Sequence, residues 1–241
     1  MAGDPSLEMT GEILLALQEN GADLIELGIP YSDPLADGPI IQLSAARALK
    51  LGTSPVKVFE LLETIKDKLR IPIILFTYFN PVLSYGFKNF CDLASKVGVA
   101  GLIIPDLPLE EATSFSEIAE SYNLDLILLV APTTPYERMK VISNKTKGFT
   151  YLVSVTGVTG ERNNLENRVE DLIGQLKEVS HRPIAVGFGI SSPEHVNKVK
   201  NWGADGVIIG SAFVKRIYES EVKNIITEVA NFCADMRRAA D

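Results

Sequence analysis

The sequence predicts one domain, residues 1–241, with the fold of a TIM (β/α)8-type barrel in which seven strands are visible and the first strand is missing. Three observations carry this prediction. Short apolar stretches alternate with helical patterns along the whole chain, no change in composition divides it, and a lone helix precedes the first strand. Alternation of strands and helices favours a parallel sheet. A leading helix without its strand is what an eight-fold barrel retains when its opening strand is absent.

The chain begins with a helix and a buried strand. Apolar residues recur at helical spacing from Ser6 to Asn20, and Gly21 ends that pattern. The next segment, 22–29, is short, mostly apolar and bounded by Gly21 and Pro30. These features indicate a parallel strand that is covered on both faces.

The rest of the chain repeats these two patterns. Buried strands are expected at 71–78, 101–105, 124–130, 149–154, 184–187 and 206–209. Helices are expected at 40–50, 54–69, 86–97, 109–122, 135–145, 165–179, 193–202 and, as one or two helices, 218–239. An open, doubly wound sheet is the alternative, but it would usually carry a glycine-rich dinucleotide turn after its first strand. Gly28-Ile29-Pro30 is not such a turn, so the barrel is favoured.

Composition and charge argue against several classes of protein. With 46% hydrophobic and 22% charged residues, the 241-residue chain is typical of a globular protein with a large core. Its net charge of −8 and the lack of a basic block argue against nucleic acid as a partner. No apolar run is long enough to span a bilayer, and no secretion signal is visible, so the cytoplasm or a plastid stroma is expected. Two cysteines and two histidines predict neither a disulfide framework nor a zinc cluster.

One segment concentrates the chemistry, because a buried strand leads straight into an acidic loop. Glu26 lies in the middle of the predicted strand 22–29, where a carboxylate must be paired, neutral or used for function. On residue type alone, a structural Glu satisfied by a neighbouring donor explains it as well. The loop 31–39 combines Asp33 and Asp37 with prolines and a glycine, which preset its turns. Loops after parallel strands carry the chemistry in this class of fold.

Two glycine-rich strand ends predict a phosphate site. Segments 185–191 and 207–212 close the last two strands, where a bare backbone lets amide groups face an anion beside a helix N-terminus. Each glycine alone is better explained as a turn, but strands seven and eight of such barrels recurrently bind phosphate. A third glycine-containing loop, 156–162, is either a hinged lid over the same face or a solvated connection.

Taken together, these motifs resemble those of the alpha subunit of tryptophan synthase. The resemblance rests on IELGIPYSDPLADGP from Ile25, GVTG at 157–160, VGFGIS at 186–191 and IIGSA at 208–212, and it covers the chain from Gly3 onward. It implies retro-aldol cleavage of indole-3-glycerol phosphate to indole and glyceraldehyde 3-phosphate. It also implies a beta-subunit partner in an alpha2beta2-type heterotetramer, with pyridoxal phosphate only in that partner.

The same resemblance assigns roles to residues. Glu26 and Asp37 match the catalytic pair of the family. The residues that match its substrate site and mobile loop are Phe76, Tyr78, Ile103, Tyr151, Thr159 and Phe188. Those that match its phosphate-binding positions are Gly160, Gly189, Gly210 and Ser211.

The reaction fits the two carboxylates on chemical grounds as well. Cleavage between C3 of the indole and the glycerol carbon requires protonation of C3, removal of the indole N–H proton and deprotonation of the adjacent hydroxyl. Glu26, held by an apolar strand, should have a raised pKa and shuttle protons, while Asp37 stays ionised and stabilises charge at the indole nitrogen. No metal or organic cofactor is needed. Asp106 is a candidate third acid, but a helix cap before Leu109 or a contact with the loop at Asp33-Pro34 explains it as well.

The chain departs from the family at its front end. Family members carry a helix and a first barrel strand before the segment that matches residues 2–5, so the expectation is a truncated product or a start further upstream. Two other functions stay open. One is another phosphate-binding barrel enzyme of the same pathway, although the strand-end Lys expected for the synthase is not seen. The other is a truncated, catalytically weak barrel that binds and regulates the beta subunit through loop 31–39.

Overall fold

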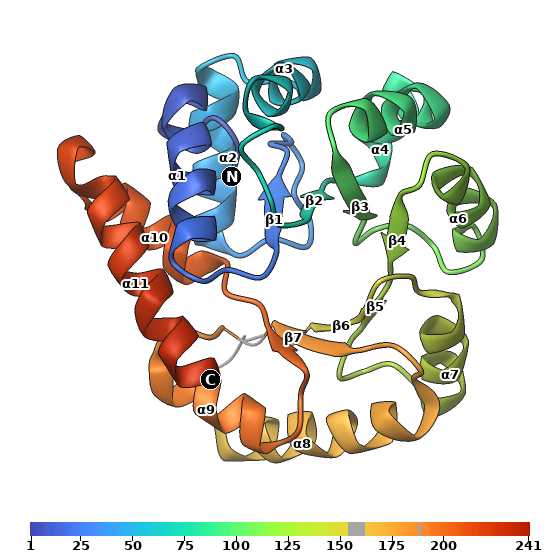
Figure 1. The fold of residues 1–241 in the computed structure, drawn as a ribbon. Coiled ribbons are helices and arrows are strands. Elements are labelled where there is room, and N and C mark those ends of the chain that lie inside the picture. Colours follow the sequence, from blue (N-terminus) through green and yellow to red (C-terminus); the bar gives the residue numbers. More distant parts are fainter. Residues whose placement is uncertain (154–161, 188) are drawn as a thin grey trace. The chain divides into compact units, whose positions relative to one another are not determined.

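The computed structural model describes residues 1–153, 162–187 and 189–241, and the side chains of all of these except 162–167 (Figure 1). The chain forms two compact units. The first contains Met1–Leu126 and Phe213–Arg237, and the second contains Ile127–Ala212 and Arg238–Asp241. Each unit is built around a parallel sheet in which the strands lie in chain order, as alternation of strands and helices predicts.

The sheet of the first unit has the order β1-β2-β3-β4. Its strands are β1 (Ile25–Gly28), β2 (Ile73–Phe76), β3 (Val99–Ile103) and β4 (Asp125–Ile127). In the register of β1 and β2, Glu26 is paired with Ile74, and Gly28 is paired with Phe76. Apolar side chains of these strands, such as Leu75 and Leu102, are fully buried, which is typical of a covered parallel sheet.

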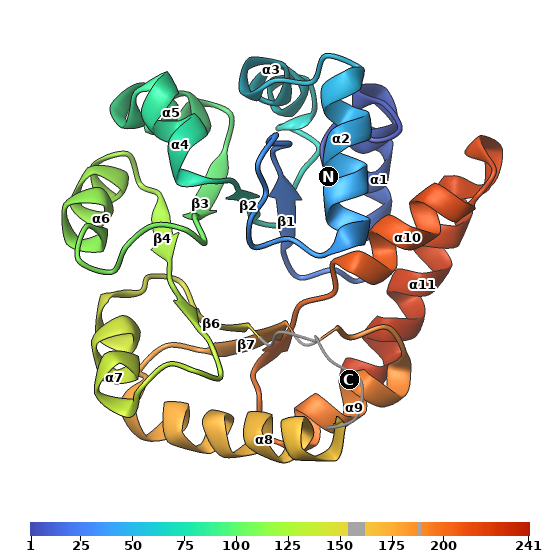
Figure 2. The same cartoon turned by 180° about the vertical axis from the view of Figure 1, so that it is seen from behind.

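Helices follow the strands of this unit and are capped as the sequence predicts. Helix α1 begins after Ser6, whose hydroxyl accepts a hydrogen bond from the Met9 amide, and it ends before Gly21, which has a positive φ of 99°. Figures 1 and 2 show α1, α3, α5 and α6 following one another along the sheet. The bounds are α1 Leu7–Glu19, α2 Pro39–Lys50, α3 Pro55–Ile65, α4 Phe79–Tyr85, α5 Phe87–Lys96 and α6 Ala112–Ser121.

The C-terminal helices are α10 (Ser211–Glu219) and α11 (Ile225–Ala240), joined by a short 3-10 turn, η1 (Val222–Asn224). Helix α11 packs on α1 through a buried cluster of Ile13, Ile225 and Val229. Arg237 of α11 also donates hydrogen bonds to both carboxylate oxygens of Asp23, at 2.9 and 2.7 Å. Helix α11 is therefore joined, within the first unit, to α1 and to the segment between α1 and β1.

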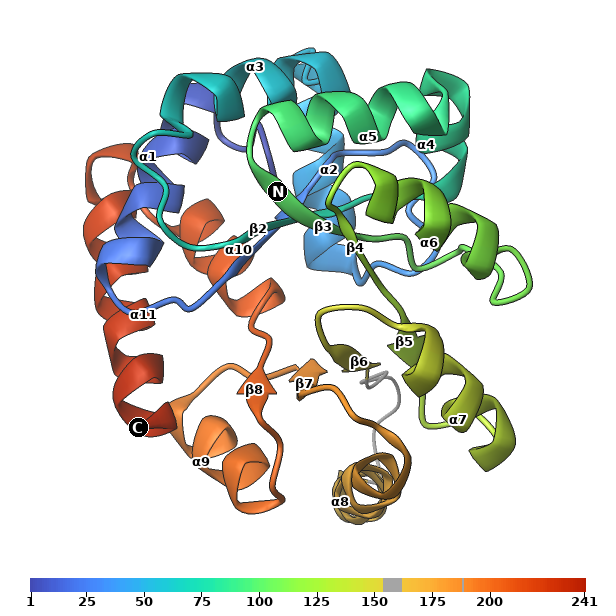
Figure 3. The same ribbon diagram turned by 45° about the vertical axis from the view of Figure 1, so that its right-hand side comes forward.

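The second unit repeats the pattern with the strand order β5-β6-β7-β8. Its strands are β5 (Leu129–Val130), β6 (Thr150–Val153), β7 (Ile184–Gly187) and β8 (Gly206–Val207). Its helices are α7 (Tyr136–Lys145), α8 (Arg162–Val179) and α9 (Pro193–Asn201). Figure 3 shows β7 and β8 side by side, and the Asp205 carboxylate accepts a hydrogen bond from the Ile184 amide at 2.9 Å.

The predicted strand 124–130 is wrong in one respect, because the structure divides it into β4 and β5. The break falls at Leu128, whose amide donates to the hydroxyl of Thr146 at 2.9 Å. That hydroxyl in turn donates to the carbonyl of Phe149 at 2.8 Å. The Leu128 amide is thus bonded to a side chain at the point where a strand ladder would be continuous.

The helix predictions also need correction at three places. Helix α3 ends at Ile65, four residues before the predicted end, and the Gln18 side chain binds the backbone of the segment that follows. Helix α4 was not predicted. Its first amide, at Phe79, donates to the Asp106 carboxylate at 2.8 Å, so it is capped by a residue 27 positions away. The C-terminal helices begin at Ser211, seven residues before the predicted start at Tyr218.

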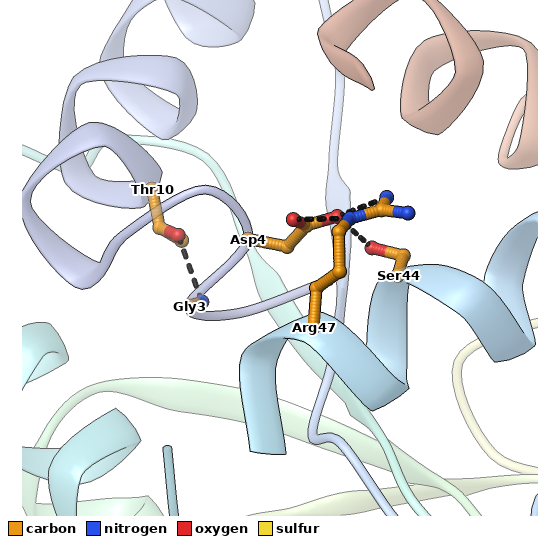
Figure 4. A network of polar contacts seen from close by, with 5 residues as sticks. All are labelled: Gly3, Asp4, Thr10, Ser44 and Arg47. Atoms are coloured by element: carbon orange, nitrogen blue, oxygen red, sulfur yellow. Dashed lines mark hydrogen bonds and ion pairs between the residues drawn. The ribbon is translucent and has the colours of Figure 1, made fainter. Parts of the chain in front are cut away.

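A polar network anchors the first residues of the chain to α2 (Figure 4). The buried Asp4 carboxylate accepts hydrogen bonds from the Ser44 hydroxyl at 2.5 Å and from the Arg47 guanidinium at 2.9 and 2.7 Å. The Gly3 amide donates to the Thr10 hydroxyl at 3.0 Å. Nearby, the Ala2 amide donates to the carbonyl of Gly28 in β1 at 2.8 Å. These bonds tie the first residues of the chain to the middle and last turn of α2 and to the end of β1.

Candidate active site

Glu26 is an acid held in a strand by apolar neighbours. It lies between the buried residues Ile25 and Leu27 of β1, and its Oε1 atom is buried with no hydrogen-bond partner among the described residues. Burial without compensation disfavours the charged form, and it raises the pKa of Glu26 from 4.5 to about 8. Glu26 therefore carries a proton at neutral pH and can donate it.

Asp37 lies on the loop that follows β1, close to the start of α2. The loop is braced at its middle, because the Ala36 amide donates to the Tyr78 hydroxyl at 3.0 Å. It is braced at its end by Gln42, whose side-chain amide donates to the Asp37 carbonyl at 2.7 Å. Burial raises the pKa of Asp37, while hydrogen bonding from Tyr78 and the charge of the Met1 amino group lower it.

Two further predicted residues share a row of the sheet with Gly28. In the register of the first sheet, Gly28 pairs with Phe76, and Phe76 pairs with Ile103. Alternate residues of a strand point to the same face of the sheet, so Gly28, Phe76 and Ile103 point to the same face as Glu26. They lie two residues nearer the carboxyl ends of their strands. Ile103 is fully buried, whereas Phe76 is half-buried. The two side chains offer an apolar wall beside Glu26.

Asp106 has a structural partner that the sequence did not suggest. Its carboxylate caps α4 at Phe79, rather than a helix before Leu109, and among the described residues it makes no hydrogen bond to the loop at Asp33-Pro34. Asp33 instead accepts from its neighbour Ser32 at 2.6 Å. Asp106 therefore fixes the turn after Tyr78, which explains a carboxylate at this strand end without a catalytic role.

The second unit holds the predicted phosphate-binding positions and Tyr151. Tyr151 is buried in β6 and lies against Gly187 in β7. Gly189 follows β7 and has a positive φ of 52°, which favours glycine. Gly210 and Ser211 lie where β8 leads into α10, so Ser211 is the first residue of that helix. The first amides of a helix lack intrahelical acceptors and are suited to an anion.

Three predicted site residues lie outside the described residues. They are Thr159, Gly160 and Phe188, and the first two belong to the glycine-containing loop 156–162. Within the described ranges, no group of three or more His, Cys, Asp or Glu side chains could hold a metal ion. In the same ranges, every helix is too short or too polar to cross a lipid bilayer.

Comparison with known proteins connects these features to one family. The sequence profile described as "Tryptophan synthase alpha chain" matches residues 1–241. A tryptophan synthase alpha chain from Prochlorococcus marinus subsp. pastoris is 76% identical over 241 residues, which are 100% of this chain and 86% of the relative. Another from Trichodesmium erythraeum is 52% identical over 99% of this chain and 90% of the relative.

Solved structures give the same result for the fold. A structure of the tryptophan synthase alpha subunit from Pyrococcus furiosus superposes with a TM-score of 0.90 and 41% sequence identity, covering 98% of this chain and 94% of that chain. A chain from Aquifex aeolicus superposes with a TM-score of 0.89 and 35% identity, covering 99% of this chain and 90% of that chain. The predicted α/β fold of the TIM-barrel type is confirmed by these relatives.

Proposed function

Because the chain belongs to the tryptophan synthase alpha chain family, we propose that it is a carbon-carbon lyase that cleaves indole-3-glycerol phosphate to indole and glyceraldehyde 3-phosphate. This step belongs to tryptophan biosynthesis. The observation that carries the proposal is the Glu26 carboxyl, whose Oε1 atom is buried with no hydrogen-bond partner among the described residues, with Asp37 on the loop that follows the same strand. A buried acid without a donor is costly for folding and is expected where chemistry requires it.

Glu26 is suited to the role of proton shuttle. With a pKa of about 8 it is protonated at neutral pH, so it can deliver a proton to C3 of the indole ring. The resulting Glu26 carboxylate then takes the proton of the hydroxyl on the adjacent glycerol carbon. As that hydroxyl becomes the aldehyde, the bond to C3 breaks and its electron pair restores the indole double bond. Glu26 ends the cycle protonated, as it began.

Asp37 is suited to the nitrogen end of the same ring. Protonation at C3 withdraws electrons from the indole nitrogen, and its N–H proton must be held or removed. An ionised Asp37, supported by hydrogen bonding from Tyr78, accepts that proton and returns it when the carbon-carbon bond breaks. Two carboxyl groups with different environments thereby take different roles. All of these proton transfers use side chains, so we assign no metal or organic cofactor to this chain.

The remaining assignments concern binding. We assign Phe76, Tyr78, Ile103 and Tyr151, with Thr159 and Phe188, to the walls around the indole ring and its neighbouring loop. We assign Gly189, Gly210 and Ser211, with Gly160, to the phosphate. The start of α10 at Ser211 supports this, because helix N-termini favour anions.

A beta subunit of tryptophan synthase is the partner that we propose, in an alpha2beta2-type assembly, since the relatives are named as alpha chains. The loop 31–39 offers a surface for it, because Leu35 is 88% exposed there. An exposed apolar side chain of that size on a preset loop favours protein contact. A purely regulatory, catalytically weak barrel is not favoured, because both carboxyl groups and both braces of the Asp37 loop are in place.

Indole release tests the proposal. The purified chain is supplied with indole-3-glycerol phosphate, with and without a tryptophan synthase beta subunit, and indole and glyceraldehyde 3-phosphate are quantified. We expect equal amounts of the two products. No product in either condition, from a chain that is folded by circular dichroism, would contradict the proposed function.

A further inference from the structure

From the contacts around the Asp37 loop, we infer that Tyr31 is a positioning residue for the reaction: its ring packs against Tyr78, its hydroxyl binds Asn80 in α4, and Tyr78 holds the Asp37 loop. The inference rests on the proposed function, and it concerns a residue outside the set assigned above to substrate or phosphate. Both tyrosines, Asp37 and their partners belong to the first unit.

The first contact joins two neighbouring residues of the acidic loop, Ala36 and Asp37, to one side chain. Tyr78 is 2% exposed, and its hydroxyl accepts a hydrogen bond from the Ala36 amide at 3.0 Å. A phenol has one proton to donate. Since an amide already occupies an acceptor position, that proton is free to point at the neighbouring Asp37 carboxyl, and hydrogen bonding from Tyr78 is one of the causes that lower the pKa of Asp37. Tyr78 therefore sets both the backbone position and the charge of the loop.

The second contact fixes Tyr78 itself. The rings of Tyr31 and Tyr78 lie with their centroids 5.5 Å apart and their planes inclined by 35°. The distance is within the range at which aromatic side chains attract one another. The Tyr31 hydroxyl accepts a hydrogen bond from the Asn80 side chain at 3.0 Å. Tyr31 thus links the Tyr78 ring, through their ring contact, to the first turn of α4, through its bond with Asn80.

The third contact holds the start of α4, which carries Asn80. Asn80 lies in the first turn of α4, whose first amide at Phe79 is bonded to Asp106. The loop, the Tyr78 side chain and the start of α4 therefore form one hydrogen-bonded unit. A side chain that fixes a catalytic loop contributes to kcat rather than to binding, because a small displacement of a reacting group lowers the rate of the chemical step strongly.

Several charged or titratable groups surround Asp37 and Tyr78, and a change in pH acts on all of them. The Met1 amino group faces Asp37 and also Asp4, and Asp106 acts on Tyr78 from the β3 side. None of them contacts Tyr31 through a hydrogen bond in the described parts of the chain. Loss of the Tyr31 hydroxyl therefore acts on Asp37 through Tyr78 and the loop.

The test compares Tyr31→Phe with a matched substitution. Tyr31→Phe removes one hydroxyl and keeps the ring. Tyr85→Phe makes the same chemical change in α4, where the Tyr85 ring packs against Phe59 and Phe90. We expect Tyr31→Phe to lower kcat for indole release about fivefold, the usual worth of one hydrogen bond. The KM should stay within twofold, and Tyr85→Phe should leave both constants unchanged.

Two further measurements separate positioning from general destabilisation. The effects of Tyr31→Phe and Tyr78→Phe on kcat should be strongly non-additive, because both act through the same loop. The acidic limb of the pH profile should move to higher pH in Tyr31→Phe, since Asp37 loses a well-placed donor. Asn80→Ala removes the same hydrogen bond from the other side and should reproduce the loss in kcat.

The outcomes distinguish the inference from the proposed function. An inactive wild-type chain contradicts the proposed function. An active wild type with Tyr31→Phe and Asn80→Ala both indistinguishable from Tyr85→Phe overturns the inference alone. Additive effects of Tyr31→Phe and Tyr78→Phe, with an unshifted acidic limb, would also overturn it, because Tyr31 would then act on stability and not on Asp37.

Discussion

Tyr151 lies so close to Gly187 that no side chain fits between them: a Cβ atom at Gly187 would be 2.6 Å from the Tyr151 hydroxyl and 2.7 Å from its ring. The two residues belong to neighbouring strands, β6 and β7, where Tyr151 pairs with Ala185. Real Cβ atoms do not approach other atoms so closely, so Gly187 is required for the position of Tyr151 and not for backbone freedom.

We therefore expect Gly187→Ala to displace the Tyr151 ring, to destabilise the chain by about 1–3 kcal/mol and to lower activity. Replacing Tyr151 by Leu in the same chain should restore much of the lost stability, because the clashing atoms are removed. Denaturant midpoints of the two single variants and the double variant measure this. Gly206→Ala is the control, because its new Cβ would lie 3.6 Å from its nearest neighbour, Ala185. Additive effects would contradict the account.

The phosphate assignment predicts an effect of Gly210→Val on binding. A Cβ at Gly210 meets no atom within 4 Å, so the fold should tolerate the substitution, while the side chain occupies the space before α10. We expect a raised KM, a weaker affinity for inorganic phosphate and an unchanged melting temperature. Gly174→Val is the matched control, since Gly174 also faces open space, on α8. A folded Gly210→Val variant with wild-type KM would show that the anion binds elsewhere.

The fold was predictable where local sequence decides it. Ser6 and Ser54 cap their helices with hydrogen bonds to amides three residues ahead, and such caps can be read from the sequence. The errors arose where a distant residue decides. Asp106 caps α4 from 27 positions away, and Thr146 binds the Leu128 amide from 18 positions away. Local pattern contains no sign of such partners.

In the candidate site, too, some residues are identifiable from local sequence and others depend on distant partners. Glu26 was identifiable because an acid in an apolar strand is costly, and Asp37 because it lies in a loop of preset turns. Tyr31 was not identified as a functional residue. Its partner Asn80 is 49 positions away, in a helix that the sequence did not reveal. Two features of the sequence could have indicated Tyr31. It lies at the start of an acidic loop, and another aromatic residue, Tyr78, ends the next predicted strand.

Activity should depend on pH through Glu26 and Asp37. As pH rises, Glu26 loses its proton near its pKa of about 8, so kcat/KM should fall on the basic side from about that pH. The pKa of Asp37 is raised from 3.8, so the acidic limb should lie above the usual range for an aspartate. Initial rates between pH 5 and 10, with circular dichroism at each pH, measure both limbs. A rate that stays level well above pH 8 would contradict the role of Glu26.

The ionisation of Glu26 should make the free energy of unfolding fall as pH rises. An acidic residue whose pKa is lowered in the native state has the opposite effect. The pKa of Glu26 is higher in the native chain than in the unfolded chain, so between about 4.5 and 8 the native chain holds the extra proton. The free energy of unfolding then falls as pH rises, by up to about 1.4 kcal/mol per pH unit from this group. Glu26→Gln removes the titration. Urea midpoints at pH 5 and 8 should show Glu26→Gln gaining stability relative to wild type at the higher pH. A constant difference between the two proteins would refute a raised pKa.

The central claim is that Glu26 and Asp37 perform the proton transfers, and the rate of indole release in conservative variants tests it most directly. Glu26→Gln and Asp37→Asn should each lower kcat by at least about 100-fold, the usual worth of acid-base catalysis, with unchanged circular dichroism and phosphate affinity. Asp33→Asn is the control, because Asp33 lies exposed on the same loop and its carboxylate binds only Ser32 in the described structure. A Glu26→Gln variant that releases indole at the wild-type rate would contradict the account.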